Sequence, residues 1–194
     1  MIDDKKLKEV ESRVKQYLKE GVITTKGKKE FVDFFLKNAR DSLESAKVLY
    51  DLSVDKEKQG VMGLTDFNGL LWVVNASYYS MFYMARALLE SEGIKIRSDL
   101  SIHARTFDAL VYFFYLNGRL QKRIIEYLAE AEEESADLLG MQKANELIKE
   151  YFFEKDKRSS FTYDTSAVMI KTKAKTSVDR ATKFNAEIGK IIKT

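Results

Sequence analysis

Apolar side chains recur along most of this 194-residue chain at intervals of three and four residues. That spacing places them on one face of an α-helix, so the pattern predicts amphipathic helices that each bury one side. Glycines and charged clusters separate the periodic segments and mark where each helix stops. The expected helices span residues 3–20, 28–53, 66–91, 101–116 and 120–154, and a last segment from about residue 164 to the C-terminus.

Three stretches between these helices carry no helical period. Residues 22–26 have β-branched character but are too few to predict a sheet. Residues 55–65 hold charges and two glycines and are expected to form a loop, as are residues 156–164. Asp66 is the expected N-cap of the third helix, and Gly140 is a position where the fifth helix could bend.

The third expected helix contains nineteen consecutive residues without a charge, from Phe67 to Ala85. A run of that length invites a membrane-spanning interpretation. The run also holds Asn68, Asn75, three tyrosines and two serines, which makes it too polar for lipid, and it stands alone in the chain. A helix that is apolar on most faces is usually the buried centre of a bundle. We therefore expect a central bundle helix and no membrane partner.

Composition points in the same direction. The chain has no proline, whereas average usage of about 5% would give roughly ten, and proline interrupts helix interiors. It has no cysteine, which excludes disulfides and thiolate chemistry and suits a reducing cytoplasm. The N-terminal residues lack the apolar core of a signal peptide. We predict an all-α, cytoplasmic protein: an antiparallel up-and-down bundle of five to six helices over residues 27–194, after a helical extension over residues 1–26.

The net charge of +3 is mild, but charge is unevenly distributed along the chain. Between residues 127 and 140 there are five acidic side chains and no basic one, whereas residues 155–175 hold six basic side chains and two acidic ones. One interpretation is that these stretches are solvated helix faces that complement each other. The other is that the basic stretch contacts phosphate.

The uncharged helix has a distinctive order of residues at its centre. It reads Asn75-Ala76-Ser77-Tyr78-Tyr79-Ser80-Met81-Phe82-Tyr83-Met84-Ala85-Arg86-Ala87-Leu88-Leu89. Three later segments are Ser101-Ile102-His103, Lys157-Arg158-Ser159-Ser160-Phe161-Thr162-Tyr163 and Thr176-Ser177-Val178-Asp179-Arg180-Ala181. In content and order, these segments resemble the HEPN family of helical nucleotide- and RNA-associated proteins, over about residues 30–193. The resemblance implies a HEPN-like homodimer that binds a nucleotide or RNA. It also implies pairing with a small nucleotidyltransferase, as in toxin–antitoxin-like systems.

The same resemblance points to residues that would contact such a ligand. It assigns phosphate contacts to Lys157 and Arg158, with Tyr163 stacking or hydrogen-bonding beside them. In the central helix, Asn75 and Tyr79 interrupt an ordinary core stripe, and a polar side chain inside an apolar helix must find a hydrogen-bond partner. These two residues either order the interior of the bundle or line a cleft.

A catalytic alternative also follows from the resemblance. HEPN nucleases carry an Arg, four to six residues and then a His, and two such motifs meet across a dimer to cleave RNA without a metal. The guanidinium holds a phosphate and stabilises its developing charge, while the imidazole moves a proton of the attacking or leaving oxygen. This chain matches with Arg97 and His103, its single histidine. If the motif is aligned with Arg158 and Tyr163 instead, the histidine is missing, and tyrosine is a poor general base at neutral pH.

Other chemistry has little support in the sequence. One histidine without any cysteine argues against a zinc site. The acidic residues between 127 and 140 point in different directions around a helix and lack the spacing of a calcium loop. No cofactor and no metal are expected. Three hypotheses remain: a HEPN-like nucleotide- or RNA-binding module, a metal-independent endoribonuclease using Arg97 and His103, and a non-catalytic helical interaction protein.

Overall fold

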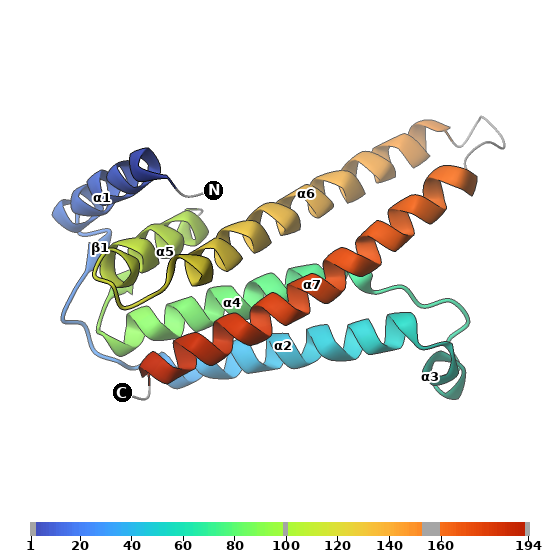
Figure 1. The fold of residues 1–194 in the computed structure, drawn as a ribbon, viewed down its shortest axis with the longest axis horizontal. Helices are drawn as coiled ribbons and strands as arrows, with labels where there is room; N and C mark the ends of the chain where they lie inside the picture. Colours follow the sequence, from blue (N-terminus) through green and yellow to red (C-terminus); the bar gives the residue numbers. More distant parts are fainter. Residues whose placement is uncertain (1–2, 99–100, 153–159, 193–194) are drawn as a thin grey trace.

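The computed structural model describes residues 3–98, 101–152 and 160–192, with side chains over the same ranges except residue 139 and residues 141–169. These residues form a helical bundle with one π-helical segment and a two-stranded ribbon, so the all-α prediction is confirmed (Figure 1). The elements are α1 (Asp4–Lys19), β1 (Ile23–Thr24), α2 (Val32–Val54), α3 (Lys56–Val61), α4 (Leu70–Ser91), β2 (Lys95–Ile96), α5 (Ile102–Leu110), η1 (Val111–Tyr115), α6 (Lys122–Phe152) and α7 (Ser160–Ile192).

Helix α4 lies at the centre of the bundle and packs against α2, α5, α6 and α7 (Figure 1). Its uncharged sequence accounts for that position, because Val73, Met81 and Leu88 have no exposed surface. Fully burying a side chain of this size contributes about 1.5–3 kcal/mol. The prediction of a buried central helix is confirmed. Among the described residues, no helix combines the length and the apolar character that a membrane span requires.

A buried line of hydrogen bonds fixes α7, α4 and α2 to one another. Asn185 of α7 donates from Nδ2 to the hydroxyl of Ser80 at 2.7 Å, and Ser80 donates onward to the carbonyl oxygen of Ala39 in α2 at 2.6 Å. Ser80 and Ala39 have no exposed surface, so the two helices approach closely at small residues. Buried polar groups need such partners, and the line therefore fixes the register of three helices.

The first helix docks on its own chain. Val10 and Val14 of α1 are buried and belong to the main apolar core. Arg13 donates two hydrogen bonds of 2.8 Å to the carboxylate of Asp108 in α5, which is 3% exposed. Asp3 caps the start of the helix by accepting from the backbone N–H of Lys6 at 2.8 Å. The N-terminal segment thus carries its own specific attachment.

The expectation that residues 22–26 form no sheet is wrong. Strand β1 pairs antiparallel with β2, with Ile23 opposite Ile96. The connection is tightened where the N–H of Gly27 donates to the carbonyl oxygen of Gly93 at 2.8 Å. A Cβ atom on Gly93 would lie 2.7 Å from the carbonyl oxygen of Gly27, and its φ is +69°, so glycine is required there. A long-range pairing of this kind leaves no mark in local periodicity.

The segment expected as a loop over residues 55–65 contains helix α3. Asp55 accepts from the backbone N–H groups of Glu57 and Lys58, both at 3.1 Å, which starts the helix. The side chain of Gln59 is buried and donates to the carbonyl oxygens of Leu52 and Phe67 at 2.8 and 3.0 Å. One amide therefore joins α3 to the residues on both sides of it.

Two expected helix boundaries also differ. Helix α4 begins at Leu70 rather than at residue 66, because the side chain of Asn68 accepts from the backbone N–H of Leu70 at 3.2 Å. Asp66, the expected cap, instead pairs with Lys56 at 2.9 Å. The helix expected over residues 101–116 becomes π-helical after α5, where Leu116 N–H donates to the carbonyl oxygen of Val111 at 3.0 Å. Helix α6 continues through Gly140 without a break.

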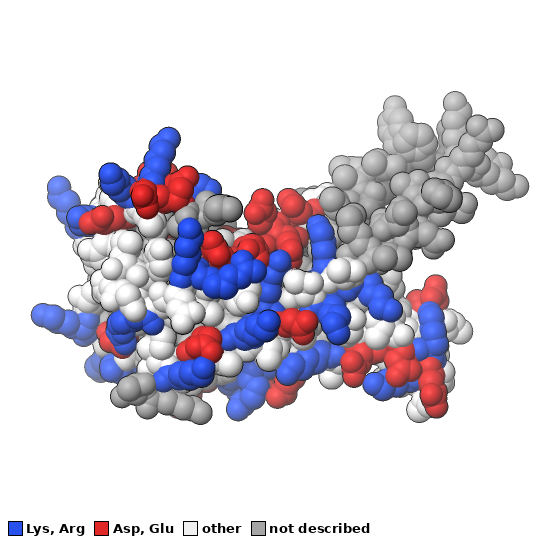
Figure 2. Space-filling view, viewed as in Figure 1, with Lys and Arg blue, Asp and Glu red and all other residues white. Residues whose placement is uncertain are grey.

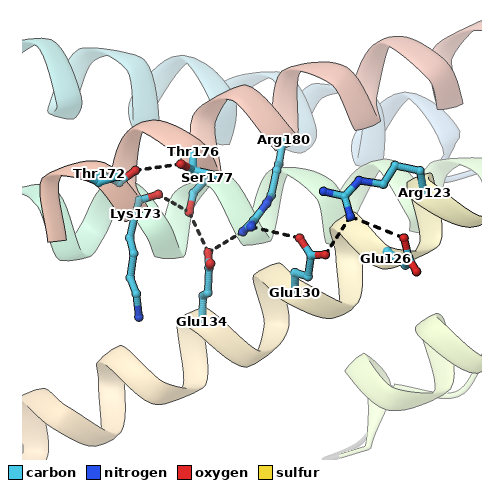
Figure 3. A network of polar contacts seen from close by, with 9 residues as sticks. All are labelled: Arg123, Glu126, Glu130, Glu134, Thr172, Lys173, Thr176, Ser177 and Arg180. Atoms are coloured by element: carbon cyan, nitrogen blue, oxygen red, sulfur yellow. Dashed lines mark hydrogen bonds and ion pairs between the residues drawn. The ribbon is translucent and has the colours of Figure 1, made fainter. Parts of the chain in front are cut away.

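The acidic stretch on α6 pairs with arginines. Arg180 of α7 lies 3.0 Å from Glu130 and 2.8 Å from Glu134, and Arg123 reaches Glu130 at 3.0 Å (Figure 3). This supports the interpretation of complementary helix faces, although neither arginine belongs to the basic stretch that was expected to supply the partner. On the face drawn in Figure 2, positive and negative side chains are interspersed.

Candidate functional site

One side of α4 is an exception to its burial. Trp72, Tyr79 and Tyr83 recur there at helical spacing, and Trp72 is 59% and Tyr79 41% exposed. Aromatic side chains of this size bury 150–250 Å² when they lie in a core. Two of these three aromatic side chains are therefore open to solvent on an otherwise buried helix, which makes this side of α4 the candidate binding surface.

A groove between α2 and α4 follows this aromatic stripe. Its volume is about 610 Å³, and it is open to solvent rather than enclosed. Helix α2 contributes mainly amide, hydroxyl and carboxylate groups, and α4 contributes mainly rings. The lining residues are Asn38, Asp41, Ser42, Ser45, Leu49, Trp72, Asn75, Ala76, Tyr79 and Tyr83. We call this feature the α2–α4 groove.

Asn75 and Tyr79, both predicted from the sequence, are brought together in the α2–α4 groove. The hydroxyl of Ser135 in α6 donates to Oδ1 of Asn75, whose side chain is almost fully buried. Asn75 therefore ties α4 to α6 and also reaches the groove. Asn75 therefore has both of the positions that the sequence left open, since it hydrogen-bonds in the interior and also lines a groove.

The aromatic stripe continues from the groove to His103. The ring of Tyr79 lies 6.1 Å from that of Tyr83 and 5.8 Å from the imidazole of His103, measured between centroids. Phe82 packs closest to the imidazole, with centroids 4.3 Å apart. The first turn of α5 thus carries the only histidine of the chain to the edge of the α2–α4 groove.

The surroundings of His103 favour a neutral imidazole. Its Nδ1 is 2.8 Å from the hydroxyl oxygen of Tyr78. Burial lowers the pKa of His103, and the positive charge of Arg86 lowers it further. Burial also raises the pKa of Tyr78, so that the phenol stays protonated. The pair can share its hydrogen bond in either sense: the phenol donates to Nδ1, or Nδ1–H donates to the phenol oxygen.

The cation that acts on His103 is Arg86, which the sequence analysis did not single out. Its guanidinium lies over the ring of Phe35, 4.8 Å from the centroid. Burial lowers the pKa of Arg86, although an arginine stays charged across the physiological range. Arg97, the expected partner, follows strand β2: its backbone N–H donates to the carbonyl oxygen of Val22 at 2.9 Å, and the residue is exposed.

The other predicted contacts lie outside what the structure describes. Lys157 and Arg158 fall outside the described residues, and Tyr163 lies in α7, where its side chain is not described. Within the described part of the chain, no three His, Asp or Glu side chains are grouped as a metal ion would need.

The sequence held signals for the residues that were missed. Arg86 is the only charged residue between Asp66 and Glu90, and a lone charge on an apolar helix calls for a partner or a function. Trp72 and Tyr83 share one helical face with Tyr79, but that spacing equally describes a core stripe. Their exposure could be known only once the neighbouring helices were placed.

Comparisons of the chain with protein-family models, with curated proteins and with solved structures find no match. The family assignment therefore stays a prediction that rests on the segments quoted from the sequence.

Proposed function

We propose that the α2–α4 groove binds the bases of a nucleotide or of single-stranded RNA. The observation that carries this proposal is the row of Trp72, Tyr79 and Tyr83 along an open groove on an otherwise buried helix. Stacking of a base on an aromatic side chain contributes about 1–3 kcal/mol and tolerates any sequence, because every base has a π-face. This function is the first of the three hypotheses from the sequence.

The spacing within the row suits a planar ring. Trp72 and Tyr79 are seven residues apart, which is about 10.5 Å along a helix. Ala76 lies between them and presents only a methyl group to the groove. A flat heterocycle above Ala76 can therefore stack on the ring of Trp72 or of Tyr79. The apolar side of the groove can cover one face of the ring, and the polar wall of α2 can meet its edge.

Arg86 and His103 extend the site beyond the groove. A guanidinium is the group best suited to a phosphate, because it is planar and donates in pairs. A neutral imidazole adds a hydrogen-bonding group without a fixed charge. Lys157 and Arg158 stay predicted phosphate contacts. A homodimer and a nucleotidyltransferase partner likewise stay predictions from the family resemblance.

The single tryptophan provides a direct test. Trp72 is the only one in the chain, so its fluorescence reports on the groove alone. Titration with a single-stranded RNA of mixed sequence is expected to quench it with saturation. The variant Tyr79→Leu, which removes a ring but keeps an apolar side chain, should weaken binding about tenfold. Val61→Ala removes an exposed apolar side chain outside the groove lining and serves as the control.

Two results would contradict the proposal. One is the absence of saturable quenching by RNA or by nucleoside monophosphates. The other is equal affinity for the wild-type protein and the Tyr79→Leu variant. Either result would favour the third hypothesis, a helical interaction protein without such a ligand.

Metal-independent RNA cleavage is a second candidate function, favoured by the position of His103 beside the groove and within the influence of a cation. A neutral imidazole is the form that can accept a proton. Cleavage in the presence of EDTA should be lost in His103→Ala. Comparing Arg86→Met with Arg97→Met would identify which guanidinium acts. Equal cleavage by wild type and His103→Ala, or none by either, removes this candidate.

A further inference from the structure

The wall of the α2–α4 groove that α2 supplies is rich in hydrogen-bond acceptors, although the hydroxyl of Ser42 can also donate. Asn38 donates its Nδ2 to the carbonyl oxygen of Phe34 at 2.7 Å, which leaves Oδ1 to present. The hydroxyl of Ser45 donates to the backbone carbonyl oxygen of Asp41 at 2.8 Å, which leaves its lone pairs. Asp41 itself lines the groove as a carboxylate. A ligand edge with neighbouring donors therefore suits this wall.

Asp41 keeps one carboxylate oxygen for a ligand. Its Oδ2 accepts from Lys37, an exposed residue on the preceding turn of α2. The other oxygen, Oδ1, accepts no hydrogen bond from the residues that the structure describes, and about half of the Asp41 side chain is exposed. A hydrogen bond to an ionised group is roughly twice as strong as one between neutral groups. Asp41 is therefore the strongest acceptor in the groove lining.

Asn75 presents the opposite character from α4. Its Oδ1 is occupied by the hydroxyl of Ser135, so the group that it has left is the donating Nδ2 amide. The lining of the α2–α4 groove thus includes several acceptors on α2 and a donor on α4.

From this pattern we infer that the groove selects guanine among the bases, an inference that rests on the proposed base-binding function. The Watson–Crick edge of guanine places two neighbouring donors, N1–H and the 2-amino group, beside an acceptor, O6. Oδ1 of Asp41 has two lone pairs and can accept from both donors, and O6 suits the amide of Asn75. Adenine and cytosine each present a single amino group next to a bare ring nitrogen. Uracil presents one N–H between two carbonyls.

The test compares nucleoside monophosphates by the quenching of Trp72, with N-acetyltryptophanamide as a correction for absorbance. Guanosine monophosphate is expected to bind about tenfold more tightly than inosine monophosphate, which differs only in lacking the 2-amino group. The adenosine, cytidine and uridine monophosphates should bind no better than inosine monophosphate. In Asp41→Asn, the dissociation constants of guanosine and inosine monophosphates should lie within about twofold of each other. Glu44→Gln removes the same charge one turn along α2 and should keep the preference.

The outcomes separate the two levels of the proposal. Equal affinity for all five nucleotides in the quenching titrations, or an unchanged guanine preference in Asp41→Asn, would overturn guanine selection and leave base binding in place. Displacement of guanosine monophosphate by an equal concentration of agmatine would also overturn it, because the site would then be selecting a guanidinium. No quenching by any nucleotide or RNA would remove both.

Discussion

Tyr78 and His103 join the central helix to α5 through a hydrogen bond of 2.8 Å between the phenol oxygen and the imidazole Nδ1. Both groups are partly buried, and burial moves both pKa values toward the neutral form, upward for the phenol and downward for the imidazole. The pair therefore holds one hydrogen bond between two uncharged groups at neutral pH. It fixes the ring of His103 against Phe82 and Tyr79 at the edge of the groove.

The pKa of His103 is expected to lie below the ordinary value of about 6.5. Because the chain has one histidine, its imidazole proton signals in an NMR pH titration need no assignment. Arg86→Met removes a positive charge that lowers this pKa and should raise it. Arg97→Met should leave it unchanged. A wild-type pKa at or above 6.5 would contradict the effect of burial on His103, and equal effects of the two substitutions would contradict the assignment of the nearby positive charge to Arg86.

The same shift gives the protein a pH dependence of stability. The folded pKa of His103 lies below the unfolded one, so the unfolded chain takes up the proton first as the pH falls. The contribution of the neutral imidazole is thus fully present above about pH 6.5 and is lost as the pH falls through the folded pKa. The free energy of unfolding, measured with urea at several pH values across this interval, should fall as the pH falls. The fall should be smaller in His103→Gln. If the variant loses stability to the same extent, titratable groups other than His103 cause the pH dependence.

Arg13→Ala is expected to lower the free energy of unfolding by about 2 kcal/mol. The substitution leaves the buried carboxylate of Asp108 without its two hydrogen bonds, although water can reach the partly exposed position of Arg13. Lys15→Ala breaks an exposed pair with Glu11 on the same helix and should change stability little. Chemical denaturation measures both. Equal effects of the two substitutions would show that the attachment of α1 does not depend on Asp108.

How far the sequence predicts this structure depends on the range of the interactions. The burial of α4 follows from its local sequence, because a long uncharged run with helical period has few other ways to fold. Helix α3 was missed although its cap, Asp55, lies one residue before it, because the glycines at 60 and 63 favoured a loop. The pairing of Ile23 with Ile96 joins residues far apart in the chain, and no local pattern encodes it.

The residues of the candidate site also differ in whether local sequence or long-range packing determines them. Asn75 and Tyr79 could be named from the sequence because they are polar positions in an apolar helix. The motif spacing drew attention to Arg97 as the partner of His103. The charge that acts on His103 is instead that of Arg86, which is seventeen residues from it in sequence and reaches it through the packing of α4 against α5. The exposure of Trp72 depends on how α2 lies beside α4, which local periodicity does not contain.

Arg180→Met is expected to weaken the attachment of α7 to α6 and so to lower the free energy of unfolding, measured by chemical denaturation. The guanidinium of Arg180 lies between Glu130 and Glu134, and its side chain is only 16% exposed (Figure 3). Without it, two carboxylates on successive turns of α6 lose their shared counter-charge, at a cost of about 1–2 kcal/mol at low salt. Arg123→Met removes a more exposed cation from the same network and should have a smaller effect. The difference between the two variants should narrow as salt increases, since screening weakens the remaining repulsion.

Glu132→Gln is expected to stabilise the protein at neutral pH. Burial and the negative charge of Asp108 raise the pKa of Glu132, so the folded state holds its proton more tightly than the unfolded chain does. As the pH rises through this interval, the unfolded state loses the proton first and stability falls. A neutral amide removes that loss, and the gain in denaturation midpoint should be clear at pH 7.5 and disappear below about pH 4. Glu133→Gln makes the same substitution at the adjacent exposed position and should give little gain at either pH. Equal gains at the two positions would point to the net charge of α6 rather than to the surroundings of Glu132.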